Sequence, residues 1–372
     1  MENIAVIFGG RSCEREVSII TGLTCLNALD KKRYNPVPVY FTADNVAYTG
    51  EELLDLDFYK NFSIQNLKRA VLLSGDNTLY VKKKTKLKPF IKIDCAVNCC
   101  HGGFGENGAL AGVMECCGIP FVSPSIFAGA LTMDKLQTKE RLLGKANFAR
   151  HIAVRQDFSV GQCALSAEEL FGYPMLVKPN SLGSSIGVKV VKDLRSLTVA
   201  VMNALRYDDC VLIEEFLQDA TEINCAVYKC GDKIVVSECE KPLTKADFLT
   251  FSDKYSEGER EFPAKIQKRI SDKIKGVTEN IYKTLATGGV MRFDYLVVGS
   301  KVYLNEINSV PGSLAYYLFG DEPTVFTELL SRWIEDAKTC ANRKNSLVAD
   351  FSGGILTSLH GKGQKTKNGK KT

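Results

Sequence analysis

Buried-strand patterns alternate with helical patterns over the first third of the chain. The run IAVIFGG is continuously apolar up to two glycines, and SIITGLTCLNALDK after it has the spacing of an amphipathic helix. Two further strand patterns, YNPVPVYFT and IDCAVNCC, follow, and the second leads through HGGFGENG into another helical segment. Alternating strands and helices predict a doubly wound parallel sheet over residues 1–124, with a polar excursion at about 50–90.

The pattern changes after residue 124. A helical stretch, ALTMDKLQTKERLLGKA, precedes short strand patterns that turn signals separate: YPMLVKP, VLIEEFL, EINCAVYKCG, GVMRFDYLVVG and KVYLNEIN. One long amphipathic helix, KIQKRISDKIKGVTENIYKTLA, lies among them. Antiparallel hairpins with few helices are typical of an α+β arrangement, unlike the first third.

Composition is that of a soluble globular protein rather than a membrane protein. The chain has 372 residues, enough for two or three domains, and is 45% hydrophobic and 24% charged. No apolar run reaches the roughly eighteen residues that a membrane helix needs. The N-terminus does not resemble a signal peptide, so we expect a cytoplasmic protein.

Thirteen cysteines are an odd number and sit inside apolar runs. We expect small core residues in a reducing compartment, namely Cys95, Cys99, Cys100, Cys116 and Cys117. The sequence has no C-x-x-C spacing for a zinc site, and the cluster CCH at 99–101 is a weak metal candidate.

The formal net charge of +5 comes from the end of the chain. Five lysines lie in the last twelve residues: Lys362, Lys365, Lys367, Lys370 and Lys371. Without them the rest of the chain is formally neutral. We interpret residues 346–372 as a basic, disordered tail and expect no nucleic-acid binding by the folded part.

Two strand patterns near the C-terminus form a hairpin that carries acidic residues. If residues 299–301 make its turn, Asp294 lies directly opposite Glu306, and Arg292 lies opposite Asn308. Side chains alternate with period two along a strand, so these four share one face.

Opposed carboxylates repel, and a hard cation with oxygen ligands would relieve that repulsion. Asp294, Glu306 and Asn308 are therefore candidate magnesium ligands, because Mg²⁺ is often held by a few carboxylates together with substrate phosphates. The alternative is a solvated sheet face, which would more often pair lysine with glutamate.

A second loop suits phosphate groups, although the chain lacks G-x-x-x-x-G-K-[ST]. In KPNSLGSSIG (178–187) the glycines let backbone N–H groups turn toward an anion, and Ser184 and Ser185 add hydroxyl donors. Lys178 and Lys135 would neutralise phosphate charge. Taken alone, the loop could equally be an ordinary hairpin connection.

Two more candidates lie at the carboxyl ends of predicted parallel strands, where doubly wound sheets bind ligands. In GGRSCEREVS, Glu14 suits a cationic group such as an α-ammonium, although an acid at a helix N-terminus is equally explained by the helix dipole. His101 stands in the glycine-rich loop after another strand.

These motifs occur together in one known family. GGRSCEREVS, CHGGFGENG, MDK, LVKP–LGSSIGV, LIEEFL, SDKYSEG, MRFDYL and LNEIN-VPG stand in the order found in D-alanine–D-alanine ligases of the ATP-grasp superfamily. The resemblance covers residues 1 to about 340. It implies a Rossmann-like substrate domain at 1–124, a central ATP-grasp subdomain at 125–206 and a C-terminal subdomain with the metal site at 207–345.

The resemblance also implies roles for individual residues. ATP would contact Lys135, Lys178, Ser185, Glu214, Glu215, Leu217, Glu222 and Lys254, the last from a lid at TKADFLTFSDKYSEG. Two magnesium ions, which manganese could replace, would bind Asp294, Glu306 and Asn308. Catalysis would use Glu14, Ser184, Tyr255, Arg292 and the backbone N–H of Gly312, and substrate would meet His101 and Tyr317.

The implied activity is ATP-dependent joining of two D-alanine molecules through an acyl phosphate, for peptidoglycan synthesis. The family further implies a homodimer. The segment GSLAYYL departs from the family, because Tyr317 falls near a serine that binds the second substrate's carboxylate; Leu182 replaces a commonly acidic residue. A different second substrate (D-serine, D-lactate or another amino acid) is one alternative, although Tyr255 favours an amine. A non-catalytic nucleotide-binding protein is another.

Overall fold

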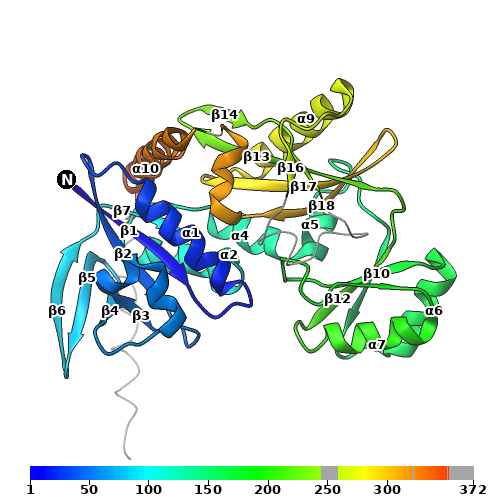
Figure 1. Cartoon of the computed structure of the whole chain (residues 1–372), viewed down its shortest axis with the longest axis horizontal. Coiled ribbons are helices and arrows are strands. Elements are labelled where there is room, and N and C mark those ends of the chain that lie inside the picture. Colours follow the sequence, from blue (N-terminus) through cyan, green and yellow to red (C-terminus); the bar gives the residue numbers. More distant parts are fainter. Residues whose placement is uncertain (244–258, 321, 350, 352–372) are drawn as a thin grey trace, which may run out of the picture.

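The computed structural model describes residues 1–243, 259–320, 322–349 and 351 of the chain. Figure 1 shows the N-terminal sheet at one end of the molecule, a smaller sheet with two helices at the other, and a third sheet between and above them. The lid residues Lys254 and Tyr255, and the tail from 352 onward, lie outside the described residues.

The N-terminal sheet has the predicted parallel core, in the order β2-β1-β7-β8. Its strands are β1 (Glu2–Gly9), β2 (Tyr34–Phe41), β7 (Cys95–Asn98) and β8 (Phe121–Val122). Helices α1 (Arg15–Ala28), α2 (Gly103–Glu106) and α3 (Ala109–Cys116) connect them. The loops after β1 and β7 therefore meet at the same edge of the sheet, as the sequence pattern predicts.

The predicted excursion at 50–90 continues this sheet rather than leaving it. Four antiparallel strands extend it to eight: β3 (Ala47–Thr49), β4 (Lys68–Leu73), β5 (Asp76–Lys83) and β6 (Lys86–Lys92), with 3₁₀ turns η1 (Glu51–Leu54) and η2 (Leu56–Asn61). β4 and β5 bury one residue each, and β6 buries none. Strands with so few buried residues have little hydrophobic periodicity, so the sequence pattern does not predict them.

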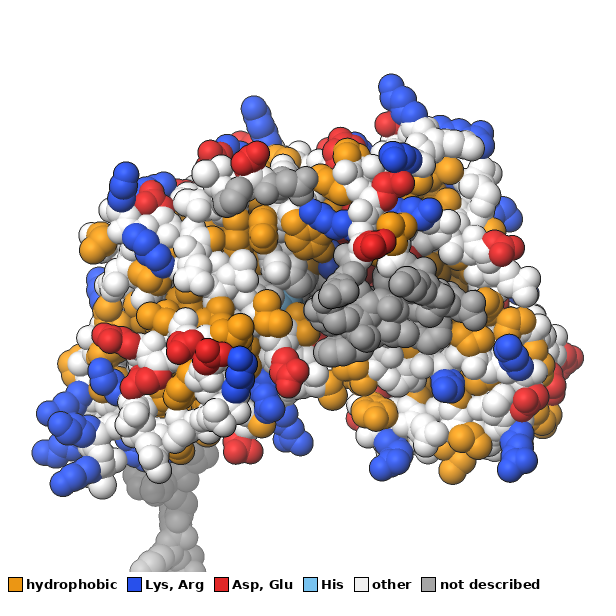
Figure 2. Space-filling model, viewed as in Figure 1, with side chains coloured by type: hydrophobic (Ala, Val, Ile, Leu, Met, Phe, Trp, Pro, Cys, Tyr) orange, Lys and Arg blue, Asp and Glu red, His pale blue; other side chains and the backbone are white. Residues whose placement is uncertain are grey.

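Lysines crowd the outer edge of this sheet, where Figure 2 shows a group of blue side chains. Lys86 and Lys88 of β6 are exposed. Charge on an edge strand discourages pairing with another chain, so this edge is protected against aggregation.

The central sheet has the order β11-β10-β12-β9 and is antiparallel in each pairing. It consists of β9 (His151–Arg155), β10 (Met175–Pro179), β11 (Lys189–Val191) and β12 (Cys210–Glu215), and it packs against α6 (Val160–Phe171) and α7 (Leu194–Ala204). Two helices lead into it from the N-terminal sheet, α4 (Ile126–Met133) and α5 (Lys135–Arg141).

The C-terminal sheet has the order β14-β13-β17-β18. Its strands are β13 (Thr221–Cys230), β14 (Lys233–Val236), β17 (Val290–Val298) and β18 (Lys301–Asn308), and the amphipathic helix α9 (Lys268–Leu285) covers one face. A short pair, β15 (Lys241–Pro242) and β16 (Arg260–Glu261), stands beside it. After β18 the chain continues into η3 (Gly312–Leu318) and α10 (Pro323–Asn345).

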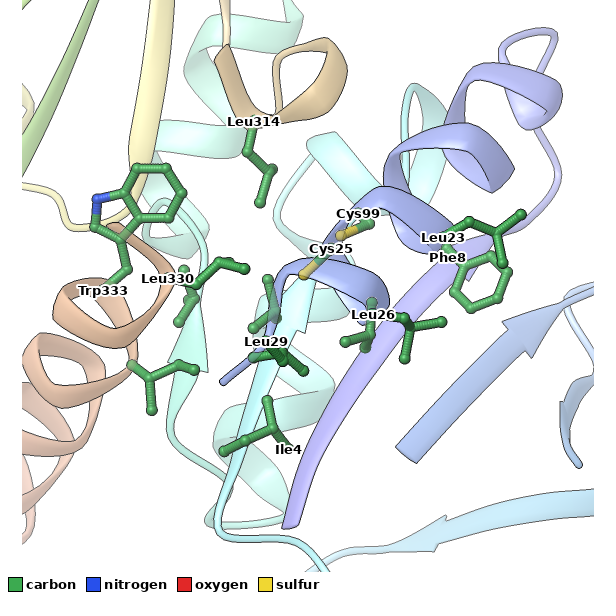
Figure 3. Packing of buried hydrophobic residues seen from close by; sticks show 14 of the residues in the cluster. Ile4, Phe8, Leu23, Cys25, Leu26, Leu29, Cys99, Leu314, Leu330 and Trp333 are labelled. Atoms are coloured by element: carbon green, nitrogen blue, oxygen red, sulfur yellow. The ribbon is translucent and has the colours of Figure 1, made fainter. Parts of the chain in front are cut away.

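The C-terminal helix α10 packs back on the first sheet. Figure 3 shows its Leu330 and Trp333 in the same cluster as Ile4 of β1 and Leu29 beyond α1. The two ends of the chain therefore share one core, which brings η3 onto α1.

The cysteine prediction holds with one exception. Each of the thirteen cysteines, all within the described residues, is a free thiol, and Cys95, Cys99, Cys100 and Cys117 are buried. Cys116 is exposed, because it ends α3 on the side away from the sheet, so its assignment to the core was wrong. Of the helices that the structure describes, none combines the length and apolarity required to span a membrane.

Candidate active site

The β17–β18 hairpin brings the predicted acidic pair together. Asp294 pairs with Glu306, and Arg292 pairs with Asn308, as predicted. The predicted three-residue turn is wrong, because Val298 pairs with Lys301 across a two-residue turn. Gly299 has a positive φ of 58°, which suits such a tight turn.

The two-residue turn alone would pair Asp294 with Asn305. A β-bulge in β18 shifts the register by one residue and so pairs Asp294 with Glu306. The register changes between Asp294 and Tyr295, where Asn305 is the extra residue on β18. The pairing arithmetic from the sequence is thus correct at the acidic pair, but the additional residue lies beside the site and not in the turn.

Cations already relieve the repulsion between the two carboxylates. The Arg292 guanidinium contacts both oxygens of the fully buried Asp294, at 2.7 and 2.9 Å. Asn308 Nδ2 donates to the same carboxylate at 2.9 Å. Lys135 Nζ lies 3.3 Å from a carboxylate oxygen of Glu306.

The loop after β10 meets the loop after β1. Ser184 Oγ donates a hydrogen bond to the Glu14 carboxylate. A side chain at Gly183 would place its Cβ 3.0 Å from a Glu14 oxygen, and one at Gly102 would stand equally close. Glycines at these two positions therefore leave room for Glu14, and the structure joins the predicted ammonium-binding and phosphate-binding loops.

Behind the loop lies a buried group of three charges. The Glu214 carboxylate receives Lys178 Nζ on one oxygen and Lys139 Nζ on the other, both at 2.9 Å. Lys178 also donates to Asn305 Oδ1 at 3.1 Å. Burial lowers the pKa of Lys178 to about 8, partly offset by Glu214. Burial alone would raise the pKa of Glu214, but the two lysines outweigh it and hold that pKa at about 2.

Neither Lys139 nor Asn305 was predicted as a site residue. Lys139 could have been found, because it follows Lys135 by four residues and so shares its face of α5. Asn305 could not, because its contact with Lys178 depends on a bulge that the sequence pattern does not reveal.

A cavity of about 1110 Å³ lies between the central and C-terminal sheets. It is large enough for a nucleotide. The predicted residues that line it are Lys135, Lys178, Ser185, Glu214, Glu215, Leu217, Glu222 and Glu306. The Glu215 carboxylate is engaged by Arg150, at 2.7 Å from its Nε and 2.8 Å from its backbone N, so the charge of Glu215 is directed at Arg150.

His101 joins the first sheet to η3. Its Nε2 lies 2.9 Å from Thr21 Oγ1, which accepts a hydrogen bond from the backbone N–H of Ser313 at 3.0 Å. The Nδ1 atom of His101 lies 3.6 Å from Glu106, whose pKa is raised by burial and lowered in part by His101. This chain of contacts fixes the loop that begins at Gly312.

That loop is wound in an uncommon way. Three successive residues, 313–315, have φ near +50°, a conformation that costs roughly 1–2 kcal/mol per non-glycine residue. The turn carries Tyr317 to Arg292, with Nη1 3.5 Å from the phenol oxygen. Arg260, which was not predicted, lies over the Tyr317 ring at 4.8 Å. Burial raises the pKa of Tyr317, and Arg292 opposes that shift.

Two sheets around a lysine-lined cavity, with an acidic hairpin beside it, define the ATP-grasp class. The chain belongs to the D-alanine–D-alanine ligase family: the family description "D-ala D-ala ligase N-terminus" matches residues 3–124, and "D-ala D-ala ligase C-terminus" matches 145–325.

Individual relatives agree with this assignment. The D-alanine--D-alanine ligase of Thermosipho melanesiensis is 36% identical over 90% of this chain and 93% of its own. The crystal structure of D-alanine–D-alanine ligase from Helicobacter pylori superposes with a TM-score of 0.75 at 29% identity, covering 90% of this chain and 98% of that one. VanG D-Ala:D-Ser ligase from Enterococcus faecalis also has a TM-score of 0.75, at 25% identity and with 90% and 99% covered.

Proposed function

We propose that the protein joins two D-alanine molecules to D-alanyl-D-alanine with ATP, for peptidoglycan precursor synthesis. The observation that carries the proposal is the contact of Ser184 with Glu14. It sets a carboxylate suited to an α-ammonium beside the loop that borders the nucleotide cavity. The family relationship supports the same reaction.

Activation of the first D-alanine requires phosphate transfer to a weakly electrophilic carboxylate. Glu14 and Ser184 hold the substrate's ammonium end, with His101 positioning it. Lys135 and Lys178 line the cavity and stabilise charge on the transferred phosphoryl group. In the proposed scheme Lys254 adds a further cation, and Tyr255 completes the hydrogen-bonded group around Glu14.

The second step is attack by the free amine of the second D-alanine on the acyl phosphate. The carbonyl oxygen gains negative charge as the tetrahedral species forms, and phosphate then leaves. Arg292 and the backbone N–H of Gly312 are the proposed donors to that oxygen, because preorganised donors stabilise charge that develops in the transition state. Tyr317, beside Arg292, borders the second substrate.

The residues fit the two proposed magnesium ions. Asp294, Glu306 and Asn308 supply the carboxylate and amide oxygens that Mg²⁺ prefers, and Asp294 pairs directly with Glu306. Bound magnesium would neutralise phosphate charge during transfer. Arg292 pairs with Asp294 and Lys135 with Glu306, so the repulsion between the two carboxylates is offset and the ligand set is preserved. The Asn308 amide, which now points its nitrogen at Asp294, would turn to offer oxygen.

The proposed organisation has three domains at 1–124, 125–206 and 207–345, with a homodimer as the assembly. The small-molecule partners are ATP and D-alanine. The shared core of α10 and the first sheet means that the third domain also supports the first.

Phosphate release tests the reaction. The protein with ATP, Mg²⁺ and D-alanine alone should release phosphate and form D-alanyl-D-alanine. Release only when D-serine or D-lactate accompanies D-alanine would assign another acceptor, consistent with Tyr317 in place of the family's serine. Nucleotide binding without release on any of these substrates would support a non-catalytic protein instead.

A further inference from the structure

Lys139 has no part in the reaction as proposed, yet it is one of the most buried charged residues among those described. Its side chain is 2% exposed, and its Nζ lies 2.9 Å from Glu214. The ring of Phe148 lies 5.1 Å from the same ammonium. Burying a lysine is costly unless the charge is paired, so the Glu214 contact compensates for that cost.

Position separates Lys139 from its neighbours. Lys178 and Glu214 line the nucleotide cavity, whereas Lys139 lies behind Glu214 and is not among the described residues that line it. Lys139 is therefore placed to act on a bound nucleotide only through Glu214.

Charge counting shows what that action is. A Glu214 carboxylate paired with Lys178 alone would form a neutral couple and remove one cation from the cavity wall. With Lys139 on its other oxygen, Glu214 is shared between two lysines, and the group keeps one net positive charge. Of the two lysines in this group, the one that lines the cavity is Lys178.

We propose that Lys139 is a positioning residue that holds Glu214 between two lysines and so leaves Lys178 with net positive charge for the nucleotide's phosphates. This inference rests on the proposed nucleotide-binding function. At an effective dielectric constant of about 20, removal of one unit charge about 12 Å from an anion weakens its binding roughly tenfold.

The test is binding of ADP and of adenosine, measured by calorimetry at pH 7, below the pKa of Lys178. Lys139→Met should weaken ADP binding about tenfold while adenosine affinity changes less than twofold. Under turnover, KM for ATP should rise and kcat at saturating ATP should stay near the wild-type value. Lys139→Arg should restore ADP affinity, and Lys145→Met, at an exposed lysine after the same helix, should leave it unchanged.

A second variant distinguishes charge sharing from a structural role. Lys139→Met/Glu214→Gln removes one cation and one anion, so Lys178 regains its net charge and ADP binding should recover relative to Lys139→Met. A neutral replacement of a buried ion pair is also often tolerated in folding, so this variant carries the test if the single one is unstable.

The proposal is overturned if Lys139→Met binds ADP as wild type does, if adenosine affinity falls as far as ADP affinity, or if Glu214→Gln brings no recovery. Failure of the wild-type protein itself to bind ADP would contradict the proposed function instead.

Discussion

Lys178 changes its charge within the pH range of ordinary assays. Its pKa is lowered from the usual 10.5 to about 8, chiefly by burial. The charged groups that act on it are Glu214 on β12 and Lys135 and Lys139 on α5. Below pH 8 the ammonium is present for phosphate; above pH 8 it is progressively lost.

We therefore predict that affinity for ADP falls as pH rises through about 8, and that ADP binding takes up protons there, because a phosphate raises the pKa of a neighbouring lysine. Calorimetry in buffers of different ionisation enthalpy measures that uptake. In Lys139→Met the fall should move to higher pH, because one of the cations that lower this pKa is gone. A pH-independent affinity between 7 and 9 would contradict the prediction.

At the scale of single residues, the sequence predicts chemistry best where a rule of spacing applies. Period two along a strand placed Asp294 opposite Glu306, and the structure confirms it. The same reasoning assigned their repulsion to a metal, whereas Arg292 and Lys135 already contribute neutralising contacts. Contacts between separate elements, such as Lys139 with Glu214, follow from packing and have no local pattern.

At the scale of elements, the β-bulge in β18 determines the position of the Asn305 side-chain amide. Asn305 is not needed for the pairing of Asp294 with Glu306, because its deletion leaves a regular hairpin with the same partners and a two-residue turn. Its side chain contacts Lys178 instead.

Both Asn305→Ala and deletion of Asn305 should therefore keep the hairpin folded and raise KM for ATP by a similar factor. We expect a rise of about ten- to a hundredfold, because a hydrogen bond to a charged group contributes roughly 1.5–3 kcal/mol. Thermal unfolding and steady-state kinetics check the pair. A deletion that abolishes folding while Asn305→Ala is harmless would show that the bulge serves the sheet and not the lysine.

The contact between α4 and the turn that follows α2 leaves no room for a side chain at Gly129. A Cβ at Gly129 would lie 2.6 Å from the Glu106 carbonyl oxygen. Gly129→Ala should destabilise the protein by about 1–3 kcal/mol through overpacking. Gly276→Ala on α9, where no neighbouring atom lies within 4 Å of the new Cβ, should instead stabilise it by about 0.5–1 kcal/mol. Melting temperatures of the two variants measure the difference, and equal shifts would refute it.

The sequence predicts most of these elements but not the extent of the first sheet. Strands β1, β2 and β7 carry buried runs, and their parallel arrangement follows from alternation with helices. Strands β4 to β6 carry almost no buried positions, so their pairing is visible only in three dimensions. Leu330 and Trp333 likewise form an apolar face on α10, but the sequence does not indicate that this face packs on the sheet at the other end of the chain.

At the scale of the whole molecule, the site is assembled from loops that are distant in sequence. Ser184 and Glu14 are 170 residues apart. If this contact holds the first D-alanine, Glu14→Gln and Ser184→Ala should each lower kcat/KM for D-alanine, and the double variant should lose less than the product of both. A coupling of about 0.5–3 kcal/mol is expected for residues in contact.

The matched control is Glu16→Gln, at an exposed carboxylate on α1, combined with Ser184→Ala. Those two effects should simply multiply. Strict multiplication for Glu14→Gln and Ser184→Ala as well would mean that the contact has no role in binding or turnover.

The left-handed turn at 313–315 provides a way to measure opening of the site by hydrogen–deuterium exchange. The amide proton of Ser313 is held by Thr21 of α1, a side chain 292 residues away. Its exchange with solvent deuterium therefore requires that the loop leave the first sheet. The exchange rate of this one amide therefore reports how often the site opens. Thr21→Val keeps the shape of the side chain but removes the hydrogen-bond acceptor. It should raise the exchange rate of the Ser313 amide, whereas amides inside α1 should keep their rates.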